Sequence, residues 1–176
     1  MPHSDIDTFD LARAVVERAD RLGVRIATAE SLTGGLLAAA IVSVPGASRV
    51  YSGGVVAYDT SLKASLLGVD AHLLAARGPV DPEVASQMAR GVRRTCAVPL
   101  DTSEVPAEAD FGISTTGVAG PDPDQQTGQA VGTVWLGISS RRGERATPFR
   151  FAGDRHEIRV ATVRRALQLL HEELFA

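Results

Sequence analysis

The sequence predicts an α/β protein built as a single domain. Segments with helical periodicity alternate with short strand-like runs through the first third of the chain. Further along, strand-like runs at 131–139 and 146–152 flank Arg141-Arg142-Gly143, which is the pattern of an antiparallel hairpin. The 176 residues, 44% of them hydrophobic and 22% charged, fit one globular domain with a substantial core.

The first expected element is a helix at 9–22. Apolar residues recur along it at helical spacing, charged residues occupy its other side, and Gly23 is placed to end it. A short strand at 24–29 follows and leads into a turn at 30–35. The next helix, at about 34–43, is apolar on nearly all sides, so we expect it to be buried against other elements or against a second subunit.

β-Branched and aromatic residues predict a strand at 50–58. Gly53-Gly54 interrupts that strand, which indicates a bulge or a close approach of two backbones. Asp59 or Thr60 is placed to cap a helix that ends at Gly68.

The middle of the chain predicts two further helices. One lies at 70–76, and the second begins at Asp81-Pro82-Glu83, where a capping residue precedes a proline at the first helical position, and continues to about 96. Residues 98–109 hold two prolines and several acids, so we expect a surface loop there.

The last third of the chain predicts a strand at 110–115 and then a loop rich in glycine and proline, which can expose backbone N–H groups at the end of that strand. After the hairpin, Asp154 is a reasonable N-cap for a final helix at 156–174.

Composition excludes several classes of function. A net charge of −3 argues against a nucleic-acid-binding protein, which usually carries a basic face. Cys96 is the single cysteine, which leaves no intrachain disulfide and no cysteine-based zinc cluster. No apolar run is long enough to span a membrane, and residues 1–7 are polar and acidic, unlike a signal peptide. We therefore expect a cytoplasmic protein with no membrane or nucleic-acid partner.

The turn at 30–35 has the composition of a ligand site. A strand that turns into a helix leaves backbone N–H groups free at the start of the helix, and these groups with the helix dipole attract anions. Gly34 and Gly35 let a ligand approach the backbone closely. The alternative is a plain N-cap in which Ser31 or Thr33 satisfies the end of the helix.

Two other places carry candidate site residues, each with an ordinary alternative. Tyr58 and Lys63 lie where a strand passes into a helix, which is where ligands gather in α/β sheets. The alternatives are a half-buried strand aromatic and a solvated lysine. Arg155 lies in the first turn of a helix, where the helix dipole disfavours a cation, so it is a candidate for binding an anionic ligand. Its alternative is an ion pair with a nearby acid.

Four segments taken together resemble the CinA C-terminal domain family, the nicotinamide-nucleotide amidohydrolases of the PncC type. The resemblance covers about residues 9–174 and rests on the order and spacing of the motifs, which Val131-Gly132-Thr133-Val134-Trp135 supports. The four segments are Glu30-Ser31-Leu32-Thr33-Gly34-Gly35, Tyr58-Asp59-Thr60-Ser61-Leu62-Lys63, Thr116-Gly117-Val118-Ala119-Gly120-Pro121-Asp122 and Gly153-Asp154-Arg155.

The resemblance implies a three-layer α/β/α sandwich with a mixed sheet, and a homodimer or higher oligomer. It implies hydrolysis of nicotinamide mononucleotide to nicotinate mononucleotide and ammonia in pyridine nucleotide recycling. Many family members carry a further N-terminal domain related to molybdopterin-binding proteins. The 176 residues are too few to hold it, so we expect its activity to be absent. Family members often have a glycine-rich run where this chain has Pro123-Asp124-Gln125-Gln126-Thr127-Gly128, which changes the expected shape of the loop.

Amide hydrolysis needs a nucleophile, a proton shuttle and donors for the developing oxyanion. None of the four histidines lies at the core of a motif, which argues against a Ser-His-Asp triad. We expect Ser31 to attack the carboxamide, Lys63 to act as its base and Tyr58 to relay the proton to the leaving ammonia. Backbone N–H groups of 116–120 or of Gly34-Gly35 are candidates for holding the oxyanion.

A second assignment uses the same residues differently. Ser31 and Thr33, together with Gly34 and Gly35, would bind the 5′-phosphate, Arg155 would neutralise it, and an activated water would attack. The sequence leaves both assignments open. The predicted substrate-binding residues are Glu30, Thr33, Gly34, Gly35, Thr116, Gly117, Gly120 and Arg155.

We expect no metal and no cofactor, since no cluster of metal ligands is visible in the sequence. The main rival function is a non-catalytic nucleotide-binding or competence-associated regulatory module. Such a module would keep the glycine loops and Arg155 but would have no use for Ser31, Tyr58 and Lys63 together. The acidic composition argues against DNA binding in competence.

Overall fold

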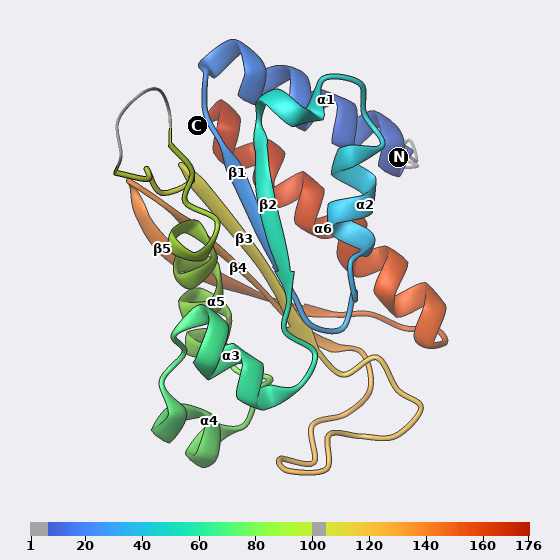
Figure 1. Ribbon diagram of the computed structural model, residues 1–176. Helices are drawn as coiled ribbons and strands as arrows, with labels where there is room; N and C mark the ends of the chain where they lie inside the picture. The colour runs from blue at the N-terminus through green and yellow to red at the C-terminus, as the bar shows by residue number, and fades with distance from the viewer. Residues whose placement is uncertain (1–6, 100–104) are drawn as a thin grey trace.

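A computed structural model describes residues 7–99 and 105–176 and shows a five-stranded mixed sheet with helices on both faces (Figure 1). The strands lie in the order β2-β1-β3-β4-β5. They are β1 (Ile26–Glu30), β2 (Tyr51–Val56), β3 (Phe111–Gly117), β4 (Thr133–Ser140) and β5 (Gly143–Arg150). The helices are α1 (Thr8–Leu22), α2 (Leu36–Val42), α3 (Thr60–Leu67), α4 (Ala71–Arg77), α5 (Pro82–Thr95) and α6 (Arg155–Phe175), with a 3₁₀ turn, η1 (Ala47–Arg49).

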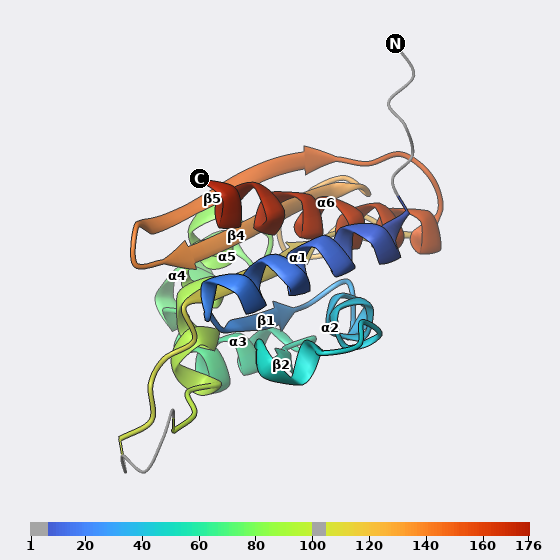
Figure 2. The ribbon, with the colours of Figure 1, turned by 90° about the horizontal axis from the view of Figure 1, so that it is seen from above.

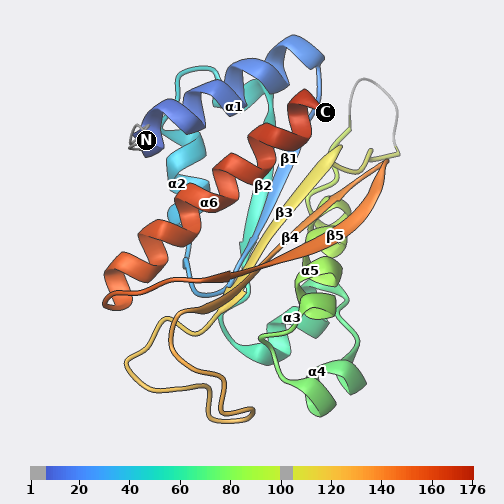
Figure 3. The same cartoon turned by 180° about the vertical axis from the view of Figure 1, so that it is seen from behind.

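The helices form two layers around the sheet. α1, α2 and α6 cover one face, and α3, α4 and α5 cover the other (Figures 1 and 3). α1 and α6 lie side by side along their face (Figure 2). The three-layer α/β/α sandwich with a mixed sheet is therefore confirmed.

Strand directions decide where the functional loops meet. β1 runs parallel to both β2 and β3, whereas β4 is antiparallel to β3 and β5 is antiparallel to β4. The predicted hairpin is thus confirmed. The carboxyl ends of β1, β2 and β3 lie at one edge of the sheet, so the loops that follow them are neighbours there.

Capping residues set the helix boundaries as expected. Asp59 accepts the Ser61 N–H, and Asp81 accepts those of Glu83 and Val84. Asp154 forms a capping box at the start of α6. The predicted 50–58 strand is shorter, because β2 ends at Val56 and the chain turns away before α3.

Gly53-Gly54 marks a bulge, as expected, and Gly54 leaves the space that two neighbouring side-chain hydroxyls occupy. Ile26 pairs with Tyr51 and Ala27 with Gly53, so Ser52 is an extra residue in β2. A Cβ on Gly54 would lie 2.3 Å from the Thr28 hydroxyl and 2.4 Å from the Tyr51 hydroxyl. Only glycine fits there.

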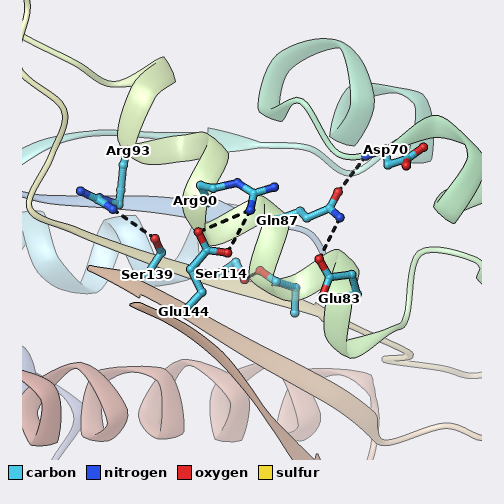
Figure 4. A network of polar contacts seen from close by, with 9 residues as sticks. Asp70, Glu83, Gln87, Arg90, Arg93, Ser114, Ser139 and Glu144 are labelled. Atoms are coloured by element: carbon cyan, nitrogen blue, oxygen red, sulfur yellow. Dashed lines mark hydrogen bonds and ion pairs between the residues drawn. The ribbon is translucent and has the colours of Figure 1, made fainter. Parts of the chain in front are cut away.

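α5 is bound to the sheet by close packing and by a polar network (Figure 4). Arg93 donates to the Ala109 carbonyl at 2.7 Å and to Ser139 at 3.3 Å, and Arg90 pairs with Glu144 at 3.2 Å. The Ser114 hydroxyl of β3 donates to the Ala85 carbonyl at 2.6 Å. These contacts anchor the helix that supports the floor of the site described below.

α2 is covered on one side only. Leu37 and Ile41 are fully buried, but Ala39 and Val42 face outward, and Val42 is 56% exposed. Burial against other elements is confirmed for one side of α2, which packs against α1, α6, β1 and β2, whereas no element of the described chain covers Ala39 and Val42 on its other side. The alternative, burial against a second subunit, stays a prediction.

Two expectations fall partly outside the described residues. The polar N-terminal segment includes residues 1–6, and the predicted loop at 98–109 includes residues 100–104. Within the described ranges, none of the helices has the length and apolar character needed to cross a membrane.

Candidate active site

A cavity of about 470 Å³ lies at the carboxyl ends of β1, β2 and β3. The loops that follow these three strands supply much of its wall, together with the segment before α5 and the first residue of α6. Its lining residues are Ser31, Leu32, Tyr58, Thr60, Lys63, Pro79, Val80, 116–120, 122–126 and Arg155. A volume in this range suits a small-molecule ligand.

Ser31 and Lys63 meet at the inner wall of this cavity. Lys63 Nζ lies 3.1 Å from Ser31 Oγ and donates to the Ala57 carbonyl at 2.8 Å. Ser31 follows β1, and its own N–H donates to the Thr115 carbonyl on β3 at 2.9 Å. The two side chains come from segments 32 residues apart, and the sheet brings them into hydrogen-bond contact.

Lys63 is almost fully buried, with 1% of its surface exposed, so the solvated alternative is wrong. Burial lowers its pKa from the ordinary 10.5 to about 8, and the nearby Asp59 carboxylate opposes this only partly. Lys63 is also the single lysine in the sequence, the other 17 basic side chains being arginines. Arginine does not lose its proton in proteins. Among the lysine and arginine side chains, therefore, only Lys63 can act as a base near neutral pH.

Arg155 and Tyr58 form the outer wall. The Arg155 guanidinium donates to the Tyr58 hydroxyl at 2.5 Å and to the Gly120 carbonyl at 2.6 Å. Tyr58 is 57% exposed and lies just beyond the end of β2, so it is not a half-buried strand aromatic. Neither of these partners is an acid, and no acid among the described residues forms an ion pair with Arg155, so the ion-pair alternative is wrong.

Glu30 lies behind the cavity and closes the start of α2. Its carboxylate is 1% exposed and accepts the N–H groups of Gly35 at 2.9 Å, Leu37 at 3.1 Å and Ala38 at 2.8 Å. An internal carboxylate thus occupies the anion site predicted at this helix start. These N–H groups are already bonded within the protein.

Thr33, Gly34 and Gly35 also lie outside the cavity lining. Thr33 is fully buried, and its hydroxyl bonds to that of Thr115 at 2.8 Å. Gly34 and Gly35 have φ values of 58° and 94°, which explains glycine at both positions. Of the predicted substrate-binding residues, the cavity therefore brings together Thr116, Gly117, Gly120 and Arg155 with the three predicted catalytic residues.

The loop after β3 forms the floor of the cavity. The Thr116 hydroxyl, near the end of β3, donates to the Pro79 carbonyl at 2.7 Å, which joins the end of this strand to the segment before α5. A Cβ on Gly117 would lie 2.6 Å from the Thr133 carbonyl, so glycine lets β3 and β4 approach closely. These contacts hold the loop backbone beside Ser31.

The sequence comparisons identify the family. The family model described as the CinA C-terminal domain matches residues 8–174. The chain belongs to the CinA C-terminal domain family. It is 44% identical to a CinA-like protein of Frankia casuarinae over 85% of this chain and 31% of that protein. It is 35% identical to a CinA-like protein of Acidobacterium capsulatum over 93% of this chain and 37% of that protein.

Solved structures of CinA proteins have the same fold. The competence/damage inducible protein CihA from Agrobacterium tumefaciens is 34% identical with a TM-score of 0.84, and the match covers 100% of both chains. A competence-damaged protein (CinA) superfamily protein from Enterobacter cloacae is 27% identical with a TM-score of 0.87, over 99% of this chain and 96% of that one. The chain spans about a third of the length of the curated CinA-like relatives it matches.

Several residues of this CinA domain line the cavity without having been singled out from the sequence. Pro79 and Val80 come from the break between two helices, Asp122 ends the motif at 116–122, and 123–126 come from the loop that departs from the family pattern. The Gln126 amide donates to the Leu74 and Ala75 carbonyls at 3.1 Å, which ties this loop to α4. For Pro79 and Val80, the sequence signal was the break in the helical pattern at Gly78-Pro79.

The arrangement can support nucleophilic acyl transfer. It combines a serine hydroxyl, a lysine amine with a lowered pKa and an arginine on one cavity. Within the described residues, no group of three or more His, Cys, Asp or Glu side chains is placed to hold a metal ion.

Proposed function

We propose that this CinA domain hydrolyses the carboxamide of nicotinamide mononucleotide to give nicotinate mononucleotide and ammonia. The observation that carries the proposal is the 3.1 Å contact between Ser31 Oγ and the buried Lys63 amine, on the wall of a cavity of small-molecule size. A binding module has no need of a buried lysine against a serine hydroxyl. The substrate identity rests on the family.

Lys63 acts as the base in this proposal. With a pKa of about 8, roughly a tenth of the amine is neutral at pH 7, about 300-fold more than at the ordinary lysine pKa. Neutral Lys63 accepts the proton of Ser31 as Oγ attacks the carboxamide carbon. The C–N bond then breaks, the lysine ammonium returns the proton to the leaving ammonia, and an acyl ester remains on Ser31.

Water completes the reaction. Lys63, neutral again, takes a proton from a water molecule as its oxygen attacks the ester carbon; the bond between that carbon and Ser31 Oγ then breaks, Lys63 returns the proton to Oγ, and the acid product loses its own proton to solvent as it leaves as the carboxylate. Backbone N–H groups of 116–120, a segment that lines the same cavity, are the proposed donors to the oxyanion, except that of Val118, which already donates to the Thr133 carbonyl at 2.9 Å. Tyr58 is a second route for the proton to the leaving group.

Arg155 is the proposed phosphate ligand. Its guanidinium lies at the exposed wall of the cavity, and guanidinium groups bind phosphate oxygens strongly. Glu30 already fills the start of α2, which disfavours the other assignment, in which Ser31, Thr33 and the two glycines hold the phosphate.

The test is ammonia release from nicotinamide mononucleotide without added metal, with the nucleotide product identified by chromatography. Ser31→Ala should lower kcat by about 1,000-fold or more and change KM little, because the covalent route is lost. Ser43→Ala is the matched control, since Ser43 is the exposed C-cap of α2, outside the cavity lining, and its hydroxyl donates to the Ala39 carbonyl of the same helix.

Two results would contradict the proposal. Nucleotide binding without turnover in the unaltered protein would instead indicate a nucleotide-binding module. A Ser31→Ala protein that loses affinity but keeps kcat would make Ser31 a phosphate ligand.

We further propose that the protein works in the cytoplasm as a homodimer or higher oligomer, on the basis of the family. Light scattering of the purified protein measures the oligomeric state directly. A monomer at micromolar concentration would contradict this assembly.

A further inference from the structure

The carbonyls of Ser31, Leu32 and Thr33, the first three residues of the turn after β1, all accept hydrogen bonds. The Ser31 carbonyl accepts the Gly34 N–H at 3.1 Å. The Leu32 carbonyl accepts Arg159 Nε at 2.9 Å. The Thr33 carbonyl accepts Arg159 Nη2 at 2.9 Å and the Leu36 N–H at 3.2 Å. One arginine therefore binds two consecutive peptide groups directly after the nucleophile.

The positions of the Leu32 and Thr33 carbonyls suit a guanidinium group that donates two hydrogen bonds at once. The two guanidinium nitrogens are rigidly spaced, so two simultaneous bonds define the orientation of both peptide planes. A Cβ on Gly34 would lie 3.3 Å from Arg159 Nη2, which shows how closely the turn passes the guanidinium. Because a trans peptide points its N–H opposite to its carbonyl, holding these carbonyls also sets the directions of the N–H groups in the turn.

Arg159 shares a helix face with Arg155. The two residues are four positions apart at the start of α6 and so lie on the same side of the helix. Arg155 contacts Tyr58 and Gly120, whereas Arg159 contacts the turn after β1. The first two turns of α6 thus join the loops that follow all three parallel strands.

We propose that Arg159 is the positioning residue for Ser31: its two hydrogen bonds, to the Leu32 and Thr33 carbonyls, hold Ser31 Oγ in hydrogen-bond contact with Lys63. Through Arg155 on the same helix face, the wall proposed to bind the phosphate and the turn that carries the nucleophile move as one unit. The kinetic consequence rests on the proposed amidase function, whereas the positional consequence does not.

The kinetic test compares Arg159→Met with Arg159→Gln, which keeps one donor. Displacing Ser31 by a fraction of an ångström should lower kcat by about 10- to 100-fold while KM stays within about threefold, and the Gln variant should be intermediate. Arg18→Met is the matched control, since Arg18 also donates to a backbone carbonyl, that of Leu174 at 3.1 Å, at the other end of α6. It should leave kcat unchanged.

The positional test is independent of any activity. Lys63 is the single lysine, so protein made with isotope-labelled lysine gives one side-chain amine signal by NMR. Arg159→Met should shift that signal and its titration midpoint, because the lysine loses its Ser31 partner, and Arg18→Met should not. If Arg159→Met fails to fold, Arg159→Gln is read in the same way.

The outcomes separate the two proposals. An unaltered protein that releases no ammonia contradicts the amidase function, and the Lys63 signal then decides the role of Arg159 alone. A folded Arg159 variant whose Lys63 signal and titration match those of the unaltered protein overturns the positioning role, whatever its activity.

Discussion

Replacing Lys63 with methionine should abolish activity and, at neutral pH, stabilise the protein. Methionine has a similar length and no charge, so it fits the same space without the desolvation penalty. The side chain is 1% exposed and its pKa lies near 8 instead of 10.5. The folded protein therefore disfavours the lysine ammonium relative to the unfolded chain.

The sign and size of the effect follow from that difference. The pKa of Lys63 is lower in the folded protein than in the unfolded chain. Below about pH 8 both states carry the proton, so the full desolvation penalty opposes folding. A pKa difference of about 2.5, at 1.36 kcal/mol for each pKa unit, makes that penalty about 3 kcal/mol. Between about pH 8 and pH 10.5 the unfolded chain binds more protons than the folded one, and the penalty disappears as the pH rises. At pH 9.5 the penalty is about 2 kcal/mol smaller than at pH 7.

The hydrogen bonds of Lys63 to Ser31 and Ala57 offset part of the gain in the variant. Two such bonds contribute about 1–3 kcal/mol together. The informative quantity is therefore the change with pH. The difference in unfolding free energy between Lys63→Met and the unaltered protein should fall by about 2 kcal/mol from pH 7 to pH 9.5.

Urea denaturation at the two pH values measures this difference, and the other titrating groups cancel because both proteins carry them. Titration of the single lysine signal by NMR gives the pKa directly. A midpoint near 10.5, or a stability difference that does not change with pH, would refute the reasoning that Lys63 is a desolvated base.

Four further results are expected. Below about pH 8 the kcat/KM of the unaltered protein should rise tenfold per pH unit and then level off, as a stopped ammonia assay would record; a flat profile would remove Lys63 as the base. Arg155→Met should raise KM at least about tenfold and change kcat little, since it removes a charge-assisted phosphate contact; an unchanged KM would place the phosphate elsewhere. Gly91→Ala should lower the unfolding free energy by about 1–3 kcal/mol in urea despite the better helix propensity of alanine, because its Cβ would lie 1.8 Å from the Leu67 carbonyl. EDTA should leave ammonia release unchanged, and activity restored by a divalent cation would contradict the serine–lysine scheme.

The elements of this fold were largely predictable because their signals are local. Asp59, Asp81 and Asp154 cap helices through their own neighbours, and the hairpin forms around a short turn between two strand-like runs. The requirement for glycine at Gly54 could also be anticipated, because a pair of glycines inside a strand indicates that a larger side chain would not fit there.

The roles within the 30–35 turn were not predictable from the turn itself. A helix start with glycines and hydroxyls predicts an anion-binding site. Whether the bound anion is a ligand or a carboxylate of the protein itself depends on the direction of the Glu30 side chain. The carboxylate folds back onto three N–H groups, and Thr33 bonds to Thr115 on another strand. These are contacts that side-chain direction and strand pairing decide.

The sequence by itself determined the class of fold, the caps and the set of segments that meet at the site. The fold class and the caps follow from signals between residues within a few positions of one another, whereas the set of segments at the site followed from the resemblance of their motifs to a known family. Only the tertiary structure decided that Lys63 is buried against Ser31, that Arg155 contacts Tyr58 and that Arg159 holds the turn. Burial and pKa depend on which distant segments cover a side chain, and the packing of the sheet and α6 decides that.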